Sequence, residues 1–145
     1  MADDLQRAVA VGNELIAIHA RFRDQLTALR TQAAAHPPRL DLDLRTHCLT
    51  FCEALHEHHQ GEDHIGFPLL EQHFPALRPV LEKLRQEHVV VARIHRDLND
   101  ALRQDDLRQL RADLDRLAAE LESHFDYEEE QLVAALNQLP GPAVT

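Results

Sequence analysis

The sequence is poor in glycine and in aromatic residues. Its 145 residues include no tryptophan, one tyrosine, five phenylalanines and four glycines, so aromatic residues make up only 4%. Leucine, alanine, arginine, glutamate and glutamine dominate instead, and these are strong helix formers. The composition therefore predicts an all-α fold. The length fits one domain with a sizeable hydrophobic core, and we expect residues 1–145 to form a single domain.

Basic clusters and long apolar runs are also missing. With 25 acidic and 15 basic residues, the formal net charge is -10. Such a charge disfavours nucleic acids and anionic membrane surfaces as partners, because both repel it. No apolar run reaches the about 18 residues of a membrane-spanning helix, and the first residues lack the charged and apolar regions of a secretion signal. We therefore expect a cytoplasmic protein that binds neither nucleic acid nor membranes.

Cysteine is limited to Cys48 and Cys52. Because these residues are four positions apart in a predicted helix, their side chains lie on one face without good geometry for a disulfide bond. A zinc site would need two further soft ligands, and none is evident. We predict that both cysteines are reduced residues of the core.

Prolines and capping residues divide the chain into four long segments. Asp41 or Asp43 can cap the second segment, and Asp105 or Asp106 can cap the fourth. Pro68 lies inside the second segment, where we expect it to kink the helix. Short connections force neighbouring helices to run antiparallel, which predicts an up-down-up-down four-helix bundle. The predicted helices span residues 3–35, 42–73, 78–103 and 106–138.

The sequence is rich in histidines and glutamates on helix faces that we expect to be buried. Each predicted helix contributes to this set, and apolar residues share its faces; Leu55 and Leu69, for example, fall on the inner face of the second helix. Histidine and glutamate are costly to bury unless something binds them, and a metal ion is a common partner. The seven candidate metal ligands are His19, His58, His59, Glu62, His88, His124 and Glu128.

The spacing of these candidates predicts that they meet at one height in the bundle. Candidates on the first and second helices lie about equally far from the connection between them, as do those on the third and fourth helices. Because a helix turns about 100° per residue, Glu62 projects between His58 and His59, where its carboxylate can bridge two ions. On the fourth helix, His124 and Glu128 share the inner stripe. The sequence therefore predicts a dinuclear metal site.

The other histidines have simpler interpretations. His95 shares the inner face of the third helix with His88 but lies two turns away, about 10 Å. Two interpretations of His95 stay open: a hydrogen-bonded core residue, or a residue that supports the site or lines an access channel to it. We interpret the remaining ones as structural or solvated: His36, His47, His56, His64 and His73.

The ligand set also indicates a metal. Mixed imidazole and carboxylate ligands suit iron, manganese or zinc, and two bridging carboxylates favour a dinuclear redox centre, for which we expect two iron ions. Five imidazoles and two bridging carboxylates fill about nine of the roughly twelve positions of two octahedral ions, and an oxo or hydroxo bridge fills about two more. About one position is left for a small molecule such as dioxygen, hydrogen peroxide or nitric oxide.

At these residues the sequence resembles the hemerythrin-like family of HHE cation-binding domains. The family signature has one histidine on the first helix, His-x-x-x-Glu on the second, one histidine on the third, and His-x-x-x-Glu or His-x-x-x-x-Asp/Glu on the fourth. The run from residue 58 to residue 63, followed by Phe67 and Pro68, looks like the form common in bacterial members. The resemblance covers about residues 8–138. The matching residues are His19, His58 with Glu62, His88, and His124 with Glu128.

One position departs from the family pattern. Hemerythrins themselves carry His-x-x-x-His on the third helix, whereas Ala92 stands four residues after His88. His59 is the candidate replacement, because it projects to the other side of Glu62 and some family members use this position as a ligand. If His59 does not bind metal, the second iron has more open positions, which favours turnover over reversible binding.

The resemblance implies a non-haem di-iron protein that acts on dioxygen, hydrogen peroxide or nitric oxide. One hypothesis is an oxygen or redox sensor or carrier, which needs a sealed apolar pocket. A second is an enzyme that decomposes peroxide, as a catalase does, or consumes nitric oxide, with Tyr127 or His95 as a relay and an electron-donor protein of unknown identity. A third is a metal-storage or structural zinc-binding bundle without redox activity. The candidate pocket walls are Leu55, Leu84, Val91, Leu121 and Phe125.

Overall fold

The computed structural model describes residues 2–35 and 40–139, with side chains from residue 11 onward. The described residues form helices and no strands, which confirms the predicted all-α class. Four helices are long: α1 (Ala2–Ala33), α2 (Leu42–Gly61), α4 (Arg78–Arg103) and α5 (Leu107–Gln138). Three short elements join α2 to α4: the π-helical turn η1 (Glu62–Gly66), the helix α3 (Phe67–His73) and the 3₁₀ turn η2 (Pro75–Leu77).

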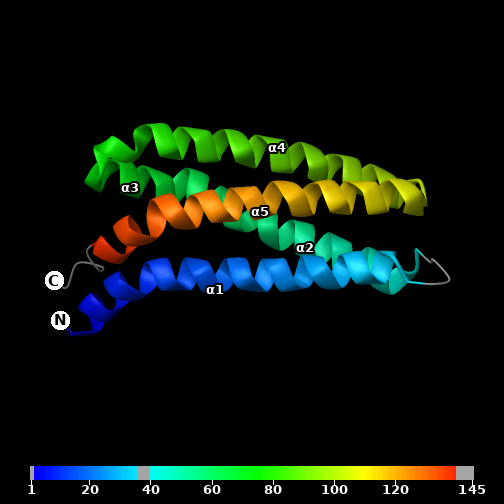
Figure 1. Cartoon of the computed structure of the whole chain (residues 1–145), viewed down its shortest axis with the longest axis horizontal. Helices are drawn as coiled ribbons and strands as arrows, with labels where there is room; N and C mark the ends of the chain where they lie inside the picture. Colours follow the sequence, from blue (N-terminus) through cyan, green and yellow to red (C-terminus); the bar gives the residue numbers. More distant parts are fainter. Residues whose placement is uncertain (1, 36–39, 140–145) are drawn as a thin grey trace.

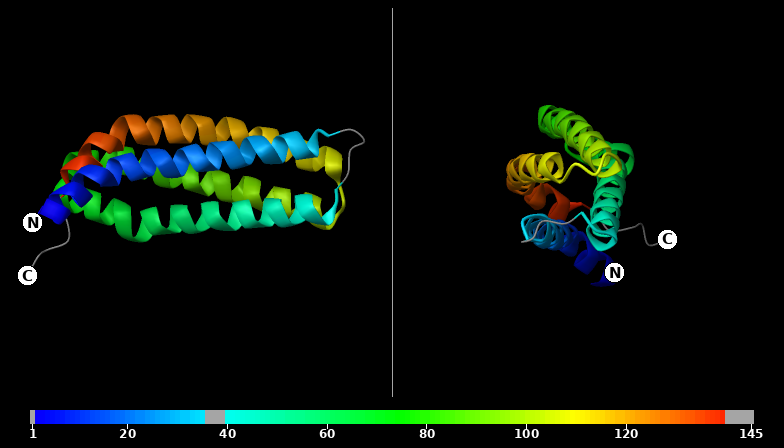
Figure 2. Two further views of the ribbon diagram at one scale, coloured as in Figure 1. Left: turned by 90° about the horizontal axis from the view of Figure 1, so that it is seen from below. Right: turned by 90° about the vertical axis from the view of Figure 1, so that its right-hand side faces the viewer.

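The long helices lie side by side along the long axis of the molecule (Figure 1). Helix α1 packs mainly on α5, and α5 packs on α4, while α2 contacts α1 and α4 from the other side. Figure 2 shows that α3 continues the direction of α2, so that α2, η1 and α3 form one column of an antiparallel four-helix bundle. No helix in the described part of the chain combines the length and the hydropathy needed to cross a membrane.

The helix ends agree closely with the sequence. Asp41 and Asp106 are the N-caps of α2 and α5, and each carboxylate accepts a hydrogen bond from the backbone N–H three residues later, at 2.9 and 3.0 Å. Of the alternatives, Asp43 lies in the first turn of α2, and Asp105 has a φ of 54° in the connection between α4 and α5. Helix α1 ends two residues before the predicted boundary at residue 35.

The π-helical turn η1, at residues 62–66, interrupts the column that α2 and α3 form. The Phe67 N–H donates to the Glu62 carbonyl, one residue farther back than in an α-helix. The extra residue rotates all later side chains by about 100°, so the core face passes from Leu69 to Leu70. The prediction that Leu69 faces the core was therefore wrong: it is 41% exposed, whereas Leu70 is 1% exposed. Pro68, which we expected to kink the helix, lies just after this turn in the first turn of α3, where no partner for a backbone N–H is required.

Two apolar clusters fill the bundle and leave a polar layer between them. The larger cluster draws buried residues from all four long helices, toward the α1–α2 and α4–α5 connections. The smaller one surrounds Phe67 and Leu132 toward the opposite end. Burying each such side chain contributes about 1.5–3 kcal/mol, so the two clusters hold the helices at fixed separation around the polar layer.

Both cysteines lie in the larger cluster. Cys48 and Cys52 are free thiols with 0% and 2% exposure, which confirms the prediction of reduced core residues. Their stacking on one face of α2 places them against the other long helices, where they pack as small apolar side chains.

Candidate metal centre

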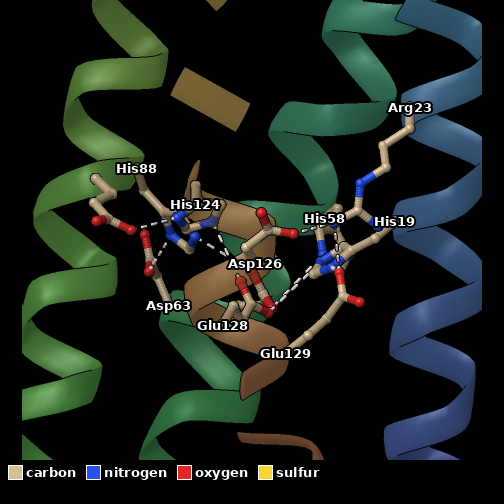
Figure 3. Close-up of polar contacts among 11 residues, drawn as sticks. His19, Arg23, His58, Asp63, His88, His124, Asp126, Glu128 and Glu129 are labelled. Atoms are coloured by element: carbon tan, nitrogen blue, oxygen red, sulfur yellow. Dashed lines mark hydrogen bonds and ion pairs between the residues drawn. The ribbon is translucent and has the colours of Figure 1, made fainter. Parts of the chain in front are cut away.

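All seven candidate ligands lie in the polar layer between the two apolar clusters. Helix α1 supplies one of them, α2 and η1 supply three, α4 supplies one and α5 supplies two. His19, His124 and Glu128 are fully buried, and His59 and His88 are nearly so. In Figure 3, His88 and His124 lie on one side of Glu128, and His19 and His58 lie on the other.

The donor atoms form two groups among the described residues. Within each group, one nitrogen or oxygen atom of every residue lies within 4.8 Å of the others, which is close enough for a single ion to contact them all. His58 and His59 fall into different groups, because adjacent residues of a helix point about 100° apart. The first group is His59, Glu62, His88 and His124, and the second group is His19, His58, Glu62 and Glu128.

Both glutamates face the two groups at once. In Glu62, Oε1 lies 3.3 Å from His88 Nε2 and Oε2 lies 3.6 Å from His58 Nε2. Glu128 repeats this arrangement between the histidines of α5 and α1, with oxygen-to-nitrogen distances of 3.2 and 3.8 Å. Each carboxylate thus presents one oxygen to each group, as a carboxylate that bridges two ions must do.

The inward-facing atoms of this layer lack hydrogen-bond partners. They comprise the Nε2 atom of each of the five histidines, one oxygen of Glu62 and both oxygens of Glu128. An unpaired buried polar atom costs about 1–3 kcal/mol, and so many together are rare in a folded protein. Five nitrogens and two carboxylates suit a pair of divalent or trivalent metal ions of the iron, manganese or zinc type. The residues present therefore fit a dinuclear metal centre.

Three further carboxylates form hydrogen bonds with histidines of the polar layer, on the side of each ring that faces away from the centre. The sequence did not predict these carboxylates. In each case the histidine Nδ1–H donates to the carboxylate, which leaves the Nε2 lone pair directed at the centre. This arrangement fixes both the tautomer and the orientation of the ring. The three hydrogen bonds join His19 to Glu129 (2.9 Å), His88 to Asp63 (2.8 Å) and His124 to Glu87 (2.8 Å).

A signal for these carboxylates was present in the sequence. Each is adjacent in the chain to a candidate ligand, yet it reaches a histidine on a different helix. Neighbouring residues of a helix diverge by about 100°, so one can face the centre while the next reaches the adjacent helix. The adjacent pairs are Glu62 with Asp63, Glu87 with His88, and Glu128 with Glu129.

Basic residues connect two of these carboxylates to the surface. Arg23 donates to Glu129 at 2.9 Å, and the Lys83 ammonium donates to Glu87 at 2.6 Å. The same ammonium lies 3.8 Å from the centre of the Tyr127 ring. Tyr127, a candidate relay in the sequence, is thus connected to the layer through Lys83 and Glu87.

Burial keeps most of these histidines neutral in the metal-free chain. It lowers the pKa of His58 to about 4 and holds the pKa values of His19, His59 and His88 below the ordinary value. The charge of a protonated imidazole would be poorly solvated in this layer. Neutral imidazole is the form that binds metal, so few protons must leave when an ion enters.

The two glutamates have opposite pKa shifts. Burial and the nearby Glu128 carboxylate raise the pKa of Glu62 well above its ordinary value. Burial acts in the same direction on Glu128, but the neighbouring Glu62 and the imidazoles of His124 and His19 lower its pKa to about 2. The two carboxylates therefore oppose each other's ionisation in the metal-free chain, and a cation between them would favour the charged form of both.

An apolar pocket of about 190 Å³ borders the second donor group. His58, Glu62 and Glu128 form its floor, and its walls come from α1, α3 and α5. None of the five predicted wall residues lines it, and the prediction of its walls was wrong: the π-helical turn brings other side chains of α3 there, Leu70 among them. The apolar walls include Leu15, Ile18, Phe67, Leu70, Leu132 and Leu136.

A second pocket of about 120 Å³ reaches the first donor group from another side. His59 and His88 border it, together with Leu55 and Val91, the two predicted wall residues that lie here. His95 is half-buried in its wall, which agrees with a position along an access channel.

One comparison with protein families gave a match that covers the whole candidate site. The family model described as the hemerythrin HHE cation binding domain matches residues 12–136, a range that includes every candidate ligand and the helices that carry them. Comparisons with the curated proteins and with the solved structures gave no match. The match confirms the resemblance inferred from the motif residues. The chain belongs to the hemerythrin HHE cation-binding domain family.

Proposed function

We propose that this chain is a non-haem iron protein that binds a small diatomic oxidant, dioxygen or nitric oxide, at a pair of iron ions. The observation that carries the proposal is the convergence of unpartnered nitrogen and oxygen atoms into two groups that share Glu62, with Glu128 lying against histidines of both. In this proposal His59, His88 and His124 hold one ion, His19 and His58 hold the other, and Glu62 and Glu128 join them.

Iron is favoured by the donor chemistry. Five neutral imidazoles and two bridging carboxylates form a nitrogen–oxygen set of intermediate softness, and helical bundles with two bridging carboxylates suit di-iron chemistry. Two iron ions supply reversible electron transfer to or from a small oxidant. A zinc-binding or metal-storage bundle without redox activity is the competing function, and metal analysis separates the two.

The two donor groups differ in their number of imidazoles, which affects where a small molecule can bind. The second group has two imidazoles where the first has three, so it occupies fewer positions around its ion. The apolar pocket lies against this group. Apart from the exposed Glu14, its walls beyond the donor residues are apolar, and side chains such as Leu15 and Leu132 offer no hydrogen bonds, which favours a diatomic gas over hydrogen peroxide.

The proposal is tested first by composition and spectrum. Protein purified from an iron-replete host is expected to carry about two irons per chain, with charge-transfer bands in the near ultraviolet and visible range. The reduced protein, kept free of oxygen, is then titrated with dioxygen and with nitric oxide. A spectral change that saturates at one equivalent per iron pair supports the proposal. Zinc in place of iron, or sustained oxygen release from added peroxide, contradicts it.

A pocket variant sharpens this test. Leu132→Phe adds bulk to the apolar pocket without touching a donor atom, so dioxygen association is expected to slow about tenfold, equivalent to about 1.4 kcal/mol of barrier. Leu49→Phe is the matched control, because Leu49 is half-exposed on α2 and distant from this pocket. Equal association rates in both variants would show that the ligand does not use the apolar pocket.

A further inference from the structure

The second pocket has a polar mouth that the proposed function does not use. His56 on α2 is exposed, and His95 on α4 is half-buried; both line the pocket whose inner end is formed by His59 and His88. Val89, another lining residue, is 46% exposed, so the pocket reaches the protein surface. Its volume of about 120 Å³ holds several water molecules.

The rings of His56 and His95 approach each other edge to face across this mouth. Their ring centres are 6.4 Å apart with the planes inclined at 61°. A metal–nitrogen bond of about 2.0–2.1 Å places an ion about 3 Å from the centre of each ring that binds it, so two rings about 6 Å apart can share one ion. Burial and the neighbouring His56 lower the pKa of His95, which keeps its imidazole in the metal-binding neutral form at pH 7.

The space between the mouth and the inner layer depends on Ala92. His88, Ala92 and His95 follow one another on the same stripe of α4, at intervals of four and three residues. Ala92 lines the pocket between the two histidines, and its methyl group leaves the passage open. Asp63 lines the same pocket and accepts a hydrogen bond from His88, so an acidic oxygen donor is present near the inner histidines.

The two pockets therefore offer different chemistry. Between the exposed Glu14 and the donor residues, the pocket beside the second donor group has apolar walls such as Leu15, Leu132 and Leu136, which disfavour a hydrated cation. The pocket at His56 and His95 is lined by four imidazoles and by the carboxylate of Asp63. The chain also carries a net charge of -10, which raises the local concentration of cations around it.

We propose that His56 and His95 form a second, weaker divalent-metal site, through which metal ions enter and leave the dinuclear centre. Three or four protein ligands are typical of a stable site. An ion that is bound by only two imidazoles and water therefore dissociates readily. The passage lined by Ala92 and Asp63 then leads it to His88 and His59. The site itself is a property of the His56–His95 pair, while its role as an entrance rests on the proposed dinuclear centre.

The site is tested directly with Ni²⁺, an ion that imidazole binds well. Calorimetric titration of the metal-loaded full-length chain is expected to show one additional ion per chain. His56→Ala and His95→Ala are each expected to weaken this binding by about tenfold or more, the size of effect that loss of a metal-supporting residue produces. His73→Ala, which removes an exposed histidine at the end of α3, is the matched control and is expected to bind as the unmodified chain does.

The entrance is tested by the rate at which the loaded protein releases ferrous iron to an excess of chelator. Ala92→Leu narrows this passage without removing a donor, and Leu136→Phe narrows the apolar pocket instead. Release is expected to slow about tenfold in Ala92→Leu and in His95→Ala, equivalent to about 1.4 kcal/mol of barrier, and to stay unchanged in Leu136→Phe. Circular dichroism and initial iron content establish that each variant is folded and loaded.

The outcomes separate this inference from the proposed function. Nickel binding that survives both histidine substitutions, or no additional nickel ion, overturns the outer site. Unchanged release from Ala92→Leu overturns the entrance. If the chain is found to hold zinc, the proposed function fails, but the nickel titration still decides whether His56 and His95 form a metal site.

Discussion

His59 and His88 stack face to face across α2 and α4, with ring centres 3.9 Å apart and planes inclined by only 15°. The stack continues to Phe67, whose ring centre lies 5.6 Å from that of His88. Aromatic packing therefore fixes the orientation of His59, while the Nε2 atoms of both histidines stay unpaired in the polar layer. The structure thus places His59, the candidate replacement for the histidine missing at Ala92, against a histidine of the family signature.

Replacing His59 tests whether it binds metal. His59→Ala removes one of the three imidazoles of the first donor group, so metal content is expected to fall from about two ions per chain toward about one, with loss of the paired-iron spectrum. Glu57→Ala, an exposed position two residues earlier on α2, is the control and is expected to keep both ions. Unchanged iron content and spectrum in His59→Ala would show that this histidine is not a ligand.

Asp63 is expected to control metal affinity without touching the metal. It accepts the hydrogen bond from His88 Nδ1 at 2.8 Å, and removal of such a partner lowers metal affinity by about 10–100-fold. Asp63→Ala is expected to show this loss in a chelator competition. Asp63→Asn keeps an acceptor oxygen and is expected to recover part of the affinity, while Glu130→Ala, an exposed acid on α5, is expected to change nothing. Equal losses in Asp63→Ala and Asp63→Asn would argue against an orienting hydrogen bond.

The sequence predicted the helices and the clustered residues because both depend on a regular period. Leucines and histidines recur at helical spacing, and equal distances from the connections place them at one height. That reasoning failed after Glu62, where one extra residue in the π-helical turn moves the core face from Leu69 to Leu70. No residue pattern in the run from Glu62 to Gly66 distinguishes a π turn from an α turn. Which of the two turns forms there depends on tertiary packing.

The carboxylates behind the histidines were missed for a different reason. Asp63, Glu87 and Glu129 point away from the centre on their own helices, so a search for inward faces discards them. Their contacts depend on the rotation of one helix against another, which spacing along the chain does not determine. In the same way, the pocket walls were predicted from the inner stripes alone, without the rotation of α3 that places Leu70 beside the site.

Removal of the metal is expected to lower the melting temperature. Metal-free protein leaves the Nε2 atoms of five histidines, one oxygen of Glu62 and both oxygens of Glu128 buried without partners. A ligand at about 100 times its dissociation constant stabilises the folded chain by about 2.7 kcal/mol, which corresponds to about 5–10 °C for a chain of this size. Calorimetry of chelated and iron-reloaded protein measures the shift, and Mg²⁺, which prefers oxygen ligands, is expected not to restore it. Equal melting temperatures with and without iron would contradict the proposed centre.

The two cysteines are expected to resist thiol reagents in the folded protein. Burial raises the pKa of Cys48 to about 11, and burial together with Cys48 raises the pKa of Cys52 to about 12. Both raised values lie above pH 8, so the neutral thiol prevails there and the reactive thiolate is scarce. A colorimetric disulfide reagent at pH 8 is expected to label both residues only after unfolding, and Leu49→Cys, at a half-exposed position, is expected to react at once. Rapid labelling of the native chain would contradict this burial.

Two glycines in helices are expected to respond in opposite directions to alanine. At Gly12, whose N–H donates to Asn137 Oδ1 at 2.8 Å, a Cβ atom would lie 2.6 Å from the Val133 carbonyl oxygen, which belongs to the backbone of α5. Alanine in a helix normally gains about 0.5–1 kcal/mol over glycine, but overpacking costs about 1–3 kcal/mol, so Gly12→Ala is expected to destabilise the bundle. A Cβ at Gly61 meets nothing within 4 Å, so Gly61→Ala is expected to stabilise it. Urea unfolding of both variants measures the two changes, and a gain in stability for Gly12→Ala would show that α1 and α5 are not in such close contact at this crossing.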